Sequence, residues 1–214
     1  MDRRTPWVLL RSGQLWAATL CWFGLMAGAQ GLLYWLPQAI RHFSAGSSDL
    51  EVGVLSALPW FAIGLGMLVN AWHSDRTQER YLHVAVAALL AGVLLAVTTL
   101  SDGGVAFALL IFAGFFLGAS QGTFWTIPPT FLSPMMLAAG LGIINMCGNV
   151  AGLIVPAMVG WIRARTGSFD LPVYAIALIL AVGAFALLGL KAWLGSRTRQ
   201  VAPSESAIIQ GTSQ

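Results

Sequence analysis

Uncharged polar side chains stand inside long apolar stretches of this sequence, and they are its candidate ligand-binding groups. Amides and hydroxyls can hydrogen-bond the carboxylate or hydroxyl oxygens of a small molecule, and an indole ring can stack on an apolar body. Asn145 and Asn149 are four residues apart and would share one face of a helix. The candidates for ligand contact are Gln30, Tyr34, Gln121, Trp125, Thr126, Asn145 and Asn149.

These residue types also have a second interpretation. Asn and Gln side chains of neighbouring membrane helices bond to one another and hold the helices together. An uncharged polar group in hydrocarbon costs free energy unless it finds such a partner or faces water. Residue type alone favours this packing role over ligand binding.

A charged cluster separates the second and third apolar stretches. Asp75, Arg76 and Arg80 lie within six residues of one another. A carboxylate beside arginines at a helix end can lock neighbouring helices through charge-assisted hydrogen bonds. The cluster is therefore a candidate gating loop, and the alternative is a solvated loop that only marks the side of the membrane.

No Asp, Glu, Lys, Arg or His lies deep inside the apolar stretches. Proton relays, catalytic centres and metal sites at membrane depth need such groups. Cys21 and Cys147 both lie in apolar stretches and are interpreted as small core residues, not as a disulfide or metal ligands. The sequence therefore indicates a protein that is not an enzyme and that has no catalytic residue, metal or cofactor.

The composition excludes a soluble domain. The chain of 214 residues is 57% hydrophobic and only 9% charged, and a soluble protein of this size could not bury that much apolar surface. Its net charge of +3 comes from residues that flank the apolar stretches. We interpret these charges as topology signals and expect the partner to be a lipid bilayer, with no nucleic acid.

The charge-free stretches predict the helices. A helix needs about 20 apolar residues to cross the hydrocarbon core, and the stretch 103–162 is long enough for two helices, with Pro128, Pro129 and Pro134 at its break. The first stretch continues past Ala27-Gly28-Ala29, so it is too long for a signal-peptide core. We expect an all-α integral membrane protein with spans near 14–40, 52–73, 82–101, 104–127, 135–162 and 172–194.

Positive charge predicts the orientation. Most Lys and Arg residues fall in the N-terminal segment, in the loop near 74–81 and after the sixth span, whereas the other side has Arg41, Arg163 and Arg165. Both termini should therefore be cytoplasmic. Residues 1–13 form a cytoplasmic segment, and the polar residues 195–214 should form a disordered cytoplasmic tail.

The spans differ in polarity. The third and sixth are nearly pure Ala, Leu, Val and Ile, whereas the first, fourth and fifth carry the polar candidates. We therefore expect the first, fourth and fifth spans to surround an aqueous space and the third and sixth to lie outside. This pattern fits two three-helix repeats of inverted topology. Glycines four residues apart (24 and 28, 118 and 122, 148 and 152) are interpreted as sites of close helix packing.

Four segments, in order, carry a family resemblance. Ala71 to Arg80 is similar to the loop signature of the major facilitator superfamily, glycine, three residues, then D-R-x-G-x-R, although Ala71 and Gln78 stand where glycines are usual. His73-Ser74-Asp75-Arg76 resembles most closely the anion:cation symporter family of organic-acid permeases. The other three segments resemble the same branch, and they are Tyr34–Gln38, Phe124–Pro128 and Ile144–Pro156.

The resemblance covers residues 14 to 194 and implies spans seven to twelve of a twelve-span transporter. Residues 1–13 would then be a remnant of the loop between the two halves, and the polar candidates would lie on substrate-contacting helices. The implied protein is the C-terminal half of a symporter-like secondary transporter for a small organic anion, in the bacterial cytoplasmic membrane. Its partner would be a six-helix N-terminal half, encoded separately or upstream, or a second copy. The alternative is a non-catalytic membrane scaffold or a homodimerising half-transporter remnant.

Overall fold

The structure is a computed structural model that describes residues 9–43, 46, 48–168 and 170–211, without the side chains of 34, 35, 37–39, 41–43 and 197–211. Within this part of the chain all regular structure is helical. The elements are α2 (Gly13–Phe43), α3 (Asp49–Thr77), α4 (Tyr81–Thr98), α5 (Gly103–Phe124), the 3-10 helix η1 (Pro128–Thr130), α6 (Pro134–Asn149), α7 (Ala151–Thr166) and α8 (Asp170–Gly211).

These helices provide six membrane spans. Each of α2, α3, α4, α5 and α8 holds an apolar window long enough to cross a bilayer. Helices α6 and α7 together form one more such window, from Pro134 to Thr166, which is the fifth span in chain order. The prediction of an all-α integral membrane protein with six transmembrane helices is thereby confirmed. The fifth expected span, 135–162, corresponds to two helices that meet at Val150.

Local sequence accounts for the helix ends. Ser48 and Glu51 form a reciprocal capping box at the start of α3. Pro134 occupies the first turn of α6, where its missing N–H costs nothing. Gly167 ends α7 in the left-handed conformation with φ 67°, and its N–H bonds to the carbonyl of Arg163.

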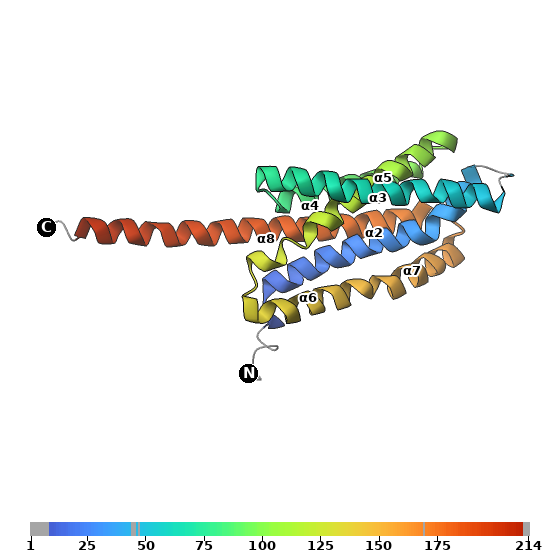
Figure 1. The fold of residues 1–214 in the computed structure, drawn as a ribbon. Helices are drawn as coiled ribbons and strands as arrows, with labels where there is room; N and C mark the ends of the chain where they lie inside the picture. Colours follow the sequence, from blue (N-terminus) through green and yellow to red (C-terminus); the bar gives the residue numbers. More distant parts are fainter. Residues whose placement is uncertain (1–8, 44–45, 47, 169, 212–214) are drawn as a thin grey trace.

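The last helix continues beyond the bundle (Figure 1). Its membrane window ends at Ser196, but the helix runs on to Gly211 through the segment that the sequence predicts to be disordered. A polar helix with no tertiary packing is marginal in water. Disorder of this tail in solution stays a prediction.

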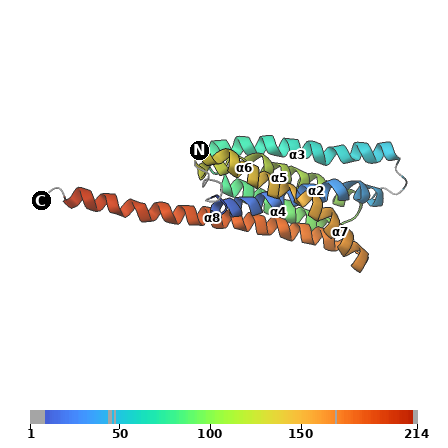
Figure 2. The ribbon, with the colours of Figure 1, turned by 90° about the horizontal axis from the view of Figure 1, so that it is seen from below.

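Helix α2 has contacts with α3, α5, α6, α7 and α8, more neighbours than any other element has. Figures 1 and 2 show it running along the bundle between α8 and the pair α6 and α7. Its membrane window is 61% buried, against 28% for those of α3 and of α6 with α7. The bundle is therefore built around α2, whereas α3 and the span formed by α6 and α7 keep broad exposed faces.

The helix contacts repeat between the two halves of the chain. The extensive contact of α3 with α5 corresponds to that of α6 and α7 with α2, and the contact of α4 with α5 corresponds to that of α8 with α2. Helices α4 and α8, which would be exchanged by the same operation, also pack on each other. Exchanging the first three spans with the last three therefore reproduces the most extensive helix contacts, as two inverted three-helix repeats require, although the smaller contacts of α2 with α3 and of α7 with α8 are not matched.

Glycines allow the closest of these contacts. A Cβ on Gly118 would collide with the backbone carbonyl of Ile63, and one on Gly66 would collide with that of Phe115. A Cβ on Gly24 would lie 3.0 Å from the carbonyl oxygen of Ile179. The predicted packing role of the spaced glycines fits these approaches, because lipid supplies no hydrophobic drive and helices associate through close packing.

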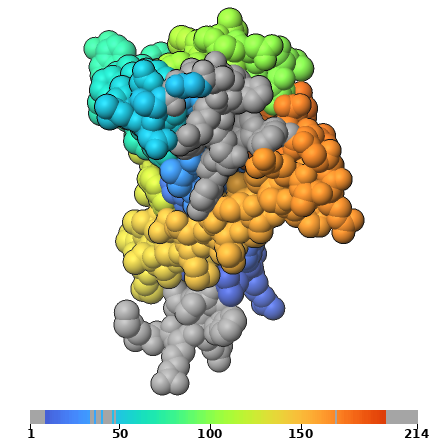
Figure 3. Space-filling view, turned by 90° about the vertical axis from the view of Figure 1, so that its right-hand side faces the viewer, coloured from blue at the N-terminus to red at the C-terminus, as the bar shows by residue number. Residues whose placement is uncertain are grey.

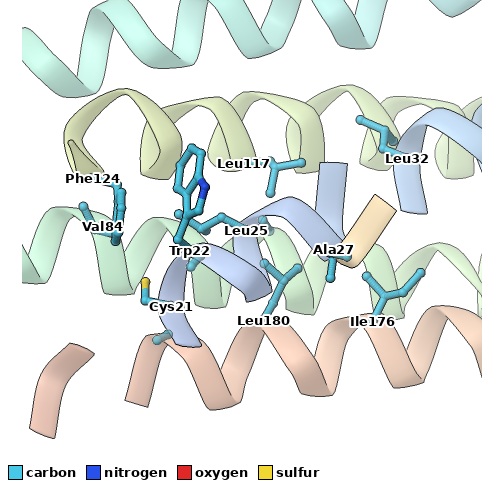
Figure 4. Packing of buried hydrophobic residues seen from close by; sticks show 14 of the residues in the cluster. Cys21, Trp22, Leu25, Ala27, Leu32, Val84, Leu117, Phe124, Ile176 and Leu180 are labelled. Carbon is cyan, nitrogen blue, oxygen red and sulfur yellow. The ribbon is translucent and has the colours of Figure 1, made fainter. Parts of the chain in front are cut away.

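The buried core lies where α2, α5 and α8 converge. Leu25, Leu117 and Leu180 meet there at 1% exposure each, and Figure 4 shows Leu25 and Leu180 beside each other, with Leu117 above them. Helices α4 and α8 each keep an exposed apolar stripe on the other side, including Val93 and Phe185. Each of them therefore has one face in the core and one that suits lipid.

Candidate functional site

Two polar candidates of α5 lie against α2. The buried Gln121 donates from Nε2 to the carbonyl of Leu25 at 3.3 Å. The half-buried Trp125 packs edge-on against Trp22, with ring centroids 4.5 Å apart. Trp22 also stacks on Phe124 at 4.9 Å, and Figure 4 shows its ring pointing from α2 toward α5. An aromatic cluster thus joins the first and fourth spans.

Trp22 and Gln30 of α2 also lie against glycines of α6 and α7. A Cβ on Gly148 would collide with the Trp22 indole, and one on Gly152 would lie 2.5 Å from Nε2 of Gln30. The amide of Gln30 and the ring of Trp22 therefore rest directly on the fifth span. Gln30 of α2 thus contacts α7, and Trp125 at the end of α5 contacts Trp22 of α2.

Asn145 and Asn149 are exposed on α6 and bond to each other. Nδ2 of Asn149 donates to the carbonyl of Asn145 at 2.8 Å and to its Oδ1 at 3.0 Å. The two residues immediately precede the junction with α7 at Val150. Pro156 adds a missing N–H in the first turns of α7. Polar groups therefore collect at an interruption of the helix in the middle of the fifth span.

Not all candidates join this arrangement. Thr126 lies in the turn after α5 and bonds to the carbonyl of Thr123 at 2.7 Å, and the side chain of Tyr34 lies outside the described residues. In the end-on view of Figure 3, part of α2 (blue) is visible between α3 (cyan) and α6 (yellow). Asn145 and Asn149 of α6 are exposed, whereas Gln30 of α2 is half-buried beside Gly152.

Sequence reasoning missed two residues near the site. Trp22 is 6% exposed, and its Nε1 has no hydrogen-bond partner among the described residues; a lone Trp in an apolar run gives no signal of its role. Asn70 donates to the carbonyl of Ala119 at 2.7 Å and to Oγ1 of Thr123 at 2.9 Å. Its amide inside a charge-free stretch was a usable signal, of the same kind as Gln121.

The charged loop forms one internal ion pair. A guanidinium nitrogen of Arg80 lies 3.4 Å from a carboxylate oxygen of Asp75, whose side chain is 67% exposed. The guanidinium of Arg76 lies 4.0 Å from the ring centre of Trp72. The candidate gating loop is therefore held in shape from within, and Asp75 presents its carboxylate outward.

Gln78 explains why a glycine is usual at this position of the signature. It caps α3 in the left-handed region, with φ 54°, which costs a residue with a Cβ about 1 kcal/mol. Its amide donates to the carbonyl of Asp75 at 2.6 Å. The departure from the family pattern is thus tolerated by a local hydrogen bond.

Two further bonds tie this loop to distant segments. Nζ of Lys191 on α8 lies 2.6 Å from Oε2 of Glu79, and the hydroxyls of Tyr81 and Thr130 lie 2.8 Å apart. Partial burial raises the pKa of Glu79, but the bond and charge of Lys191, together with backbone N–H groups, outweigh it and hold this pKa below its ordinary 4.5. The loop therefore joins α4, η1 and α8 at one end of the bundle.

Among the described residues, no group of three or more His, Cys, Asp or Glu could hold a metal ion.

Residues 2–156 match the sequence profile of the Major Facilitator Superfamily. The chain belongs to this superfamily. The predicted family is thereby confirmed, and the superfamily consists of transporters, not of enzymes.

Relatives agree with this assignment. A protein named as a candidate tartrate transporter of Agrobacterium vitis is 38% identical over 190 residues, which are 87% of this chain and 43% of the relative. A quinolone resistance transporter of Acinetobacter baumannii is 32% identical over 154 residues, which are 72% of this chain and 35% of the relative. The chain spans less than half the length of these relatives.

The fold agrees as well. The crystal structure of the Escherichia coli fucose:proton symporter superposes with a TM-score of 0.78 at 16% identity, over 89% of this chain and 46% of the symporter. The six helices therefore have the arrangement of one half of a major facilitator fold. The chain is a multi-pass membrane protein.

Proposed function

We propose that this chain is the C-terminal half of a secondary transporter for a small organic anion and that it works with an N-terminal six-helix half. The resemblance of four ordered motif segments supports its assignment to spans seven to twelve. The observation that carries the proposal is the exposed pair Asn145 and Asn149 in the middle of a span. Amides facing hydrocarbon are costly, so this face requires a second polar surface or a wet cavity.

The proposed partner half covers α3 and the α6–α7 span. These have the least buried membrane windows of the bundle, and a complete transporter of this fold is about twice as long as this chain. The substrate would lie between the halves and touch Gln30, Tyr34, Trp125, Asn145 and Asn149. Gln121 would hold α5 to α2, because it donates a hydrogen bond to the carbonyl of Leu25, whereas Thr126 would only stabilise the turn after α5 through its bond to the carbonyl of Thr123.

The exposed carboxylate of Asp75 is the proposed contact of the gating loop with the other half. Its bond to Arg80 is 3.4 Å long, so the carboxylate keeps lone pairs for donors of a second surface. We also propose the bacterial cytoplasmic membrane as the location, with both termini in the cytoplasm, because the N-terminal segment, the loop and the end of the chain together carry most of the Lys and Arg residues.

Uptake by paired halves tests the proposal. The chain is expressed in bacterial cells alone or together with the N-terminal half of the candidate tartrate transporter, and uptake of labelled tartrate is measured. We expect saturable uptake only from the pair, because the chain alone lacks half of the cavity. A quinolone serves as a second cargo, since one relative is named for quinolone resistance. Saturable uptake by the chain alone, or none by a pair present in the membrane, contradicts the proposal.

A variant of the polar face examines the site itself. Asn149→Ala should raise the KM for uptake about tenfold, the cost of one hydrogen bond to a charged group, while the amount of protein in the membrane is unchanged. Met146→Ala is the matched control, because Met146 is a neighbouring exposed side chain without an amide. Equal effects of the two changes would contradict a binding role for Asn149.

Crosslinking that joins only two copies of this chain would favour the homodimer alternative.

A further inference from the structure

A cavity opens between the first turns of α2 and residues 186–193 of α8, near the point where the membrane window of α8 ends. Its volume is about 610 Å³, and its lining includes Arg11, Gln14, Ala17, Leu190 and Trp193. None of these residues belongs to the candidate substrate site or to the gating loop. The cavity joins a polar mouth, formed by Arg11 and Gln14, to an apolar wall.

The cavity exists because α2 and α8 separate toward this end. Deeper in the membrane the helices touch closely, since a Cβ on Gly183 would lie 3.1 Å from the Cα of Cys21. Near the end, a Cβ on Gly13 or on Gly189 would meet nothing within 4 Å. Two glycines of the lining therefore face open space, and a side chain added there would enter the cavity without a collision.

Its position is that of a membrane interface. Trp16 and Trp193 are both about half exposed at this level, and tryptophan is enriched where hydrocarbon meets the headgroups. Arg11 lies just outside the apolar run, and its side chain is exposed. The charge is thus at headgroup level, and Ala17 and Leu190 lie on the hydrocarbon side.

We propose that this cavity binds one anionic phospholipid, with the phosphate at Arg11 and an acyl chain along the wall of α2 and α8. A basic pocket between membrane helices on the cytoplasmic side matches anionic headgroups in charge. The apolar wall suits the acyl chain of a phospholipid. On binding, this acyl chain leaves its contacts with neighbouring lipids and packs against the protein. Assignment to the cytoplasmic leaflet rests on the proposed orientation, whereas binding itself does not.

Native mass spectrometry of the full chain in detergent tests this proposal. The protein is incubated with palmitoyl-oleoyl phosphatidylglycerol or with the phosphatidylcholine of the same chains, and the fraction carrying one lipid is measured. We expect preferential retention of phosphatidylglycerol. Arg11→Gln should weaken that binding about fivefold, the worth of one basic residue at the surface, while Arg11→Lys keeps most of it.

Filling the cavity gives the matched comparison. Gly189→Leu should abolish the preference for phosphatidylglycerol, whereas Gly64→Leu, at another glycine with nothing within 4 Å, should leave it unchanged. Equal retention of the two lipids, an unaltered Arg11→Gln variant, or equal losses in the two leucine variants would overturn the proposal. No transport is measured, so these outcomes and those of the uptake experiment are independent.

Discussion

At the scale of single residues, Trp22 has an unusual balance of contacts. Its ring is buried against Phe124 and Trp125, but its N–H has no partner among the described residues. An unsatisfied buried donor costs about 1–3 kcal/mol, whereas the aromatic contacts stabilise the junction of α2 and α5. The packing of the indole ring therefore stabilises the fold, whereas its buried N–H without a partner costs free energy.

Two substitutions separate these contributions. Trp22→Phe keeps an aromatic ring and removes the N–H, so we expect its free energy of unfolding in mixed micelles to change by less than about 1 kcal/mol. Trp22→Ala should lower that free energy by about 3–5 kcal/mol, as other large core truncations do. A loss in Trp22→Phe as large as in Trp22→Ala would contradict this expectation.

The ion pair of Glu79 with Lys191 predicts a pH dependence. The folded-state pKa of Glu79 is held below 4.5, so its contribution to stability is complete above the unfolded pKa and is lost as the pH falls through the folded value. Both side chains are about one-third exposed, which limits the effect to about 0.5 kcal/mol. Unfolding of Glu79→Gln in detergent should lack this loss of stability as the pH falls from above 4.5 to below the folded-state pKa of Glu79.

Asp102→Asn is the control for this experiment. Asp102 is an exposed carboxyl that makes no side-chain capping bond at the start of α5. Its substitution should leave the pH dependence as in the parent chain. A parent-like profile in Glu79→Gln would assign the acid sensitivity to other carboxyl groups.

At the scale of helices, close packing of α3 on α5 depends on glycine. Gly118→Ala would place a methyl group against the backbone of Ile63, and backbone cannot rotate away, so we expect a loss of about 1–3 kcal/mol. Gly142→Ala is the matched change, because its Cβ would meet nothing within 4 Å. It should gain up to about 1 kcal/mol of helix propensity, and thermal unfolding of both variants checks the contrast.

The helices were largely predictable because each must satisfy its own backbone in lipid. Charge-free length and the prolines near residue 130 were therefore enough to predict six spans. The break at Val150 was not predicted, because the charge-free stretch runs through it without interruption. Only the tertiary setting shows that Gly148 and Gly152 bear on α2 across this break.

The candidate site was predicted less completely than the helices. Polar residue types identified Gln121 and Gln30, but not their roles, because an amide that binds a neighbouring helix has the same sequence signal as one that binds a ligand. Lys191 could not be paired with Glu79 from sequence, since 112 residues separate them. The helical periods describe neighbours within one helix and not partners on different spans.

At the scale of the whole molecule, the repeated contact pattern makes α2 and α5 equivalent centres of two triplets. The two centres are not equally covered: α2 is the most buried span, whereas the window that begins with α5 is 44% buried. The two triplets are therefore equivalent in their main helix contacts but not in how deeply their central helices are buried.

The contact of α2 with α8 joins the first of these six spans to the last of them. During synthesis α2 is made before α8, and Gly24, Gly28 and Gly31 of α2 all lie close to residues of α8. This side of α2 therefore has no partner helix until α8 has been synthesised. Insertion of α2 into the membrane consequently precedes its packing, and the synthesis of α8 completes this six-helix bundle.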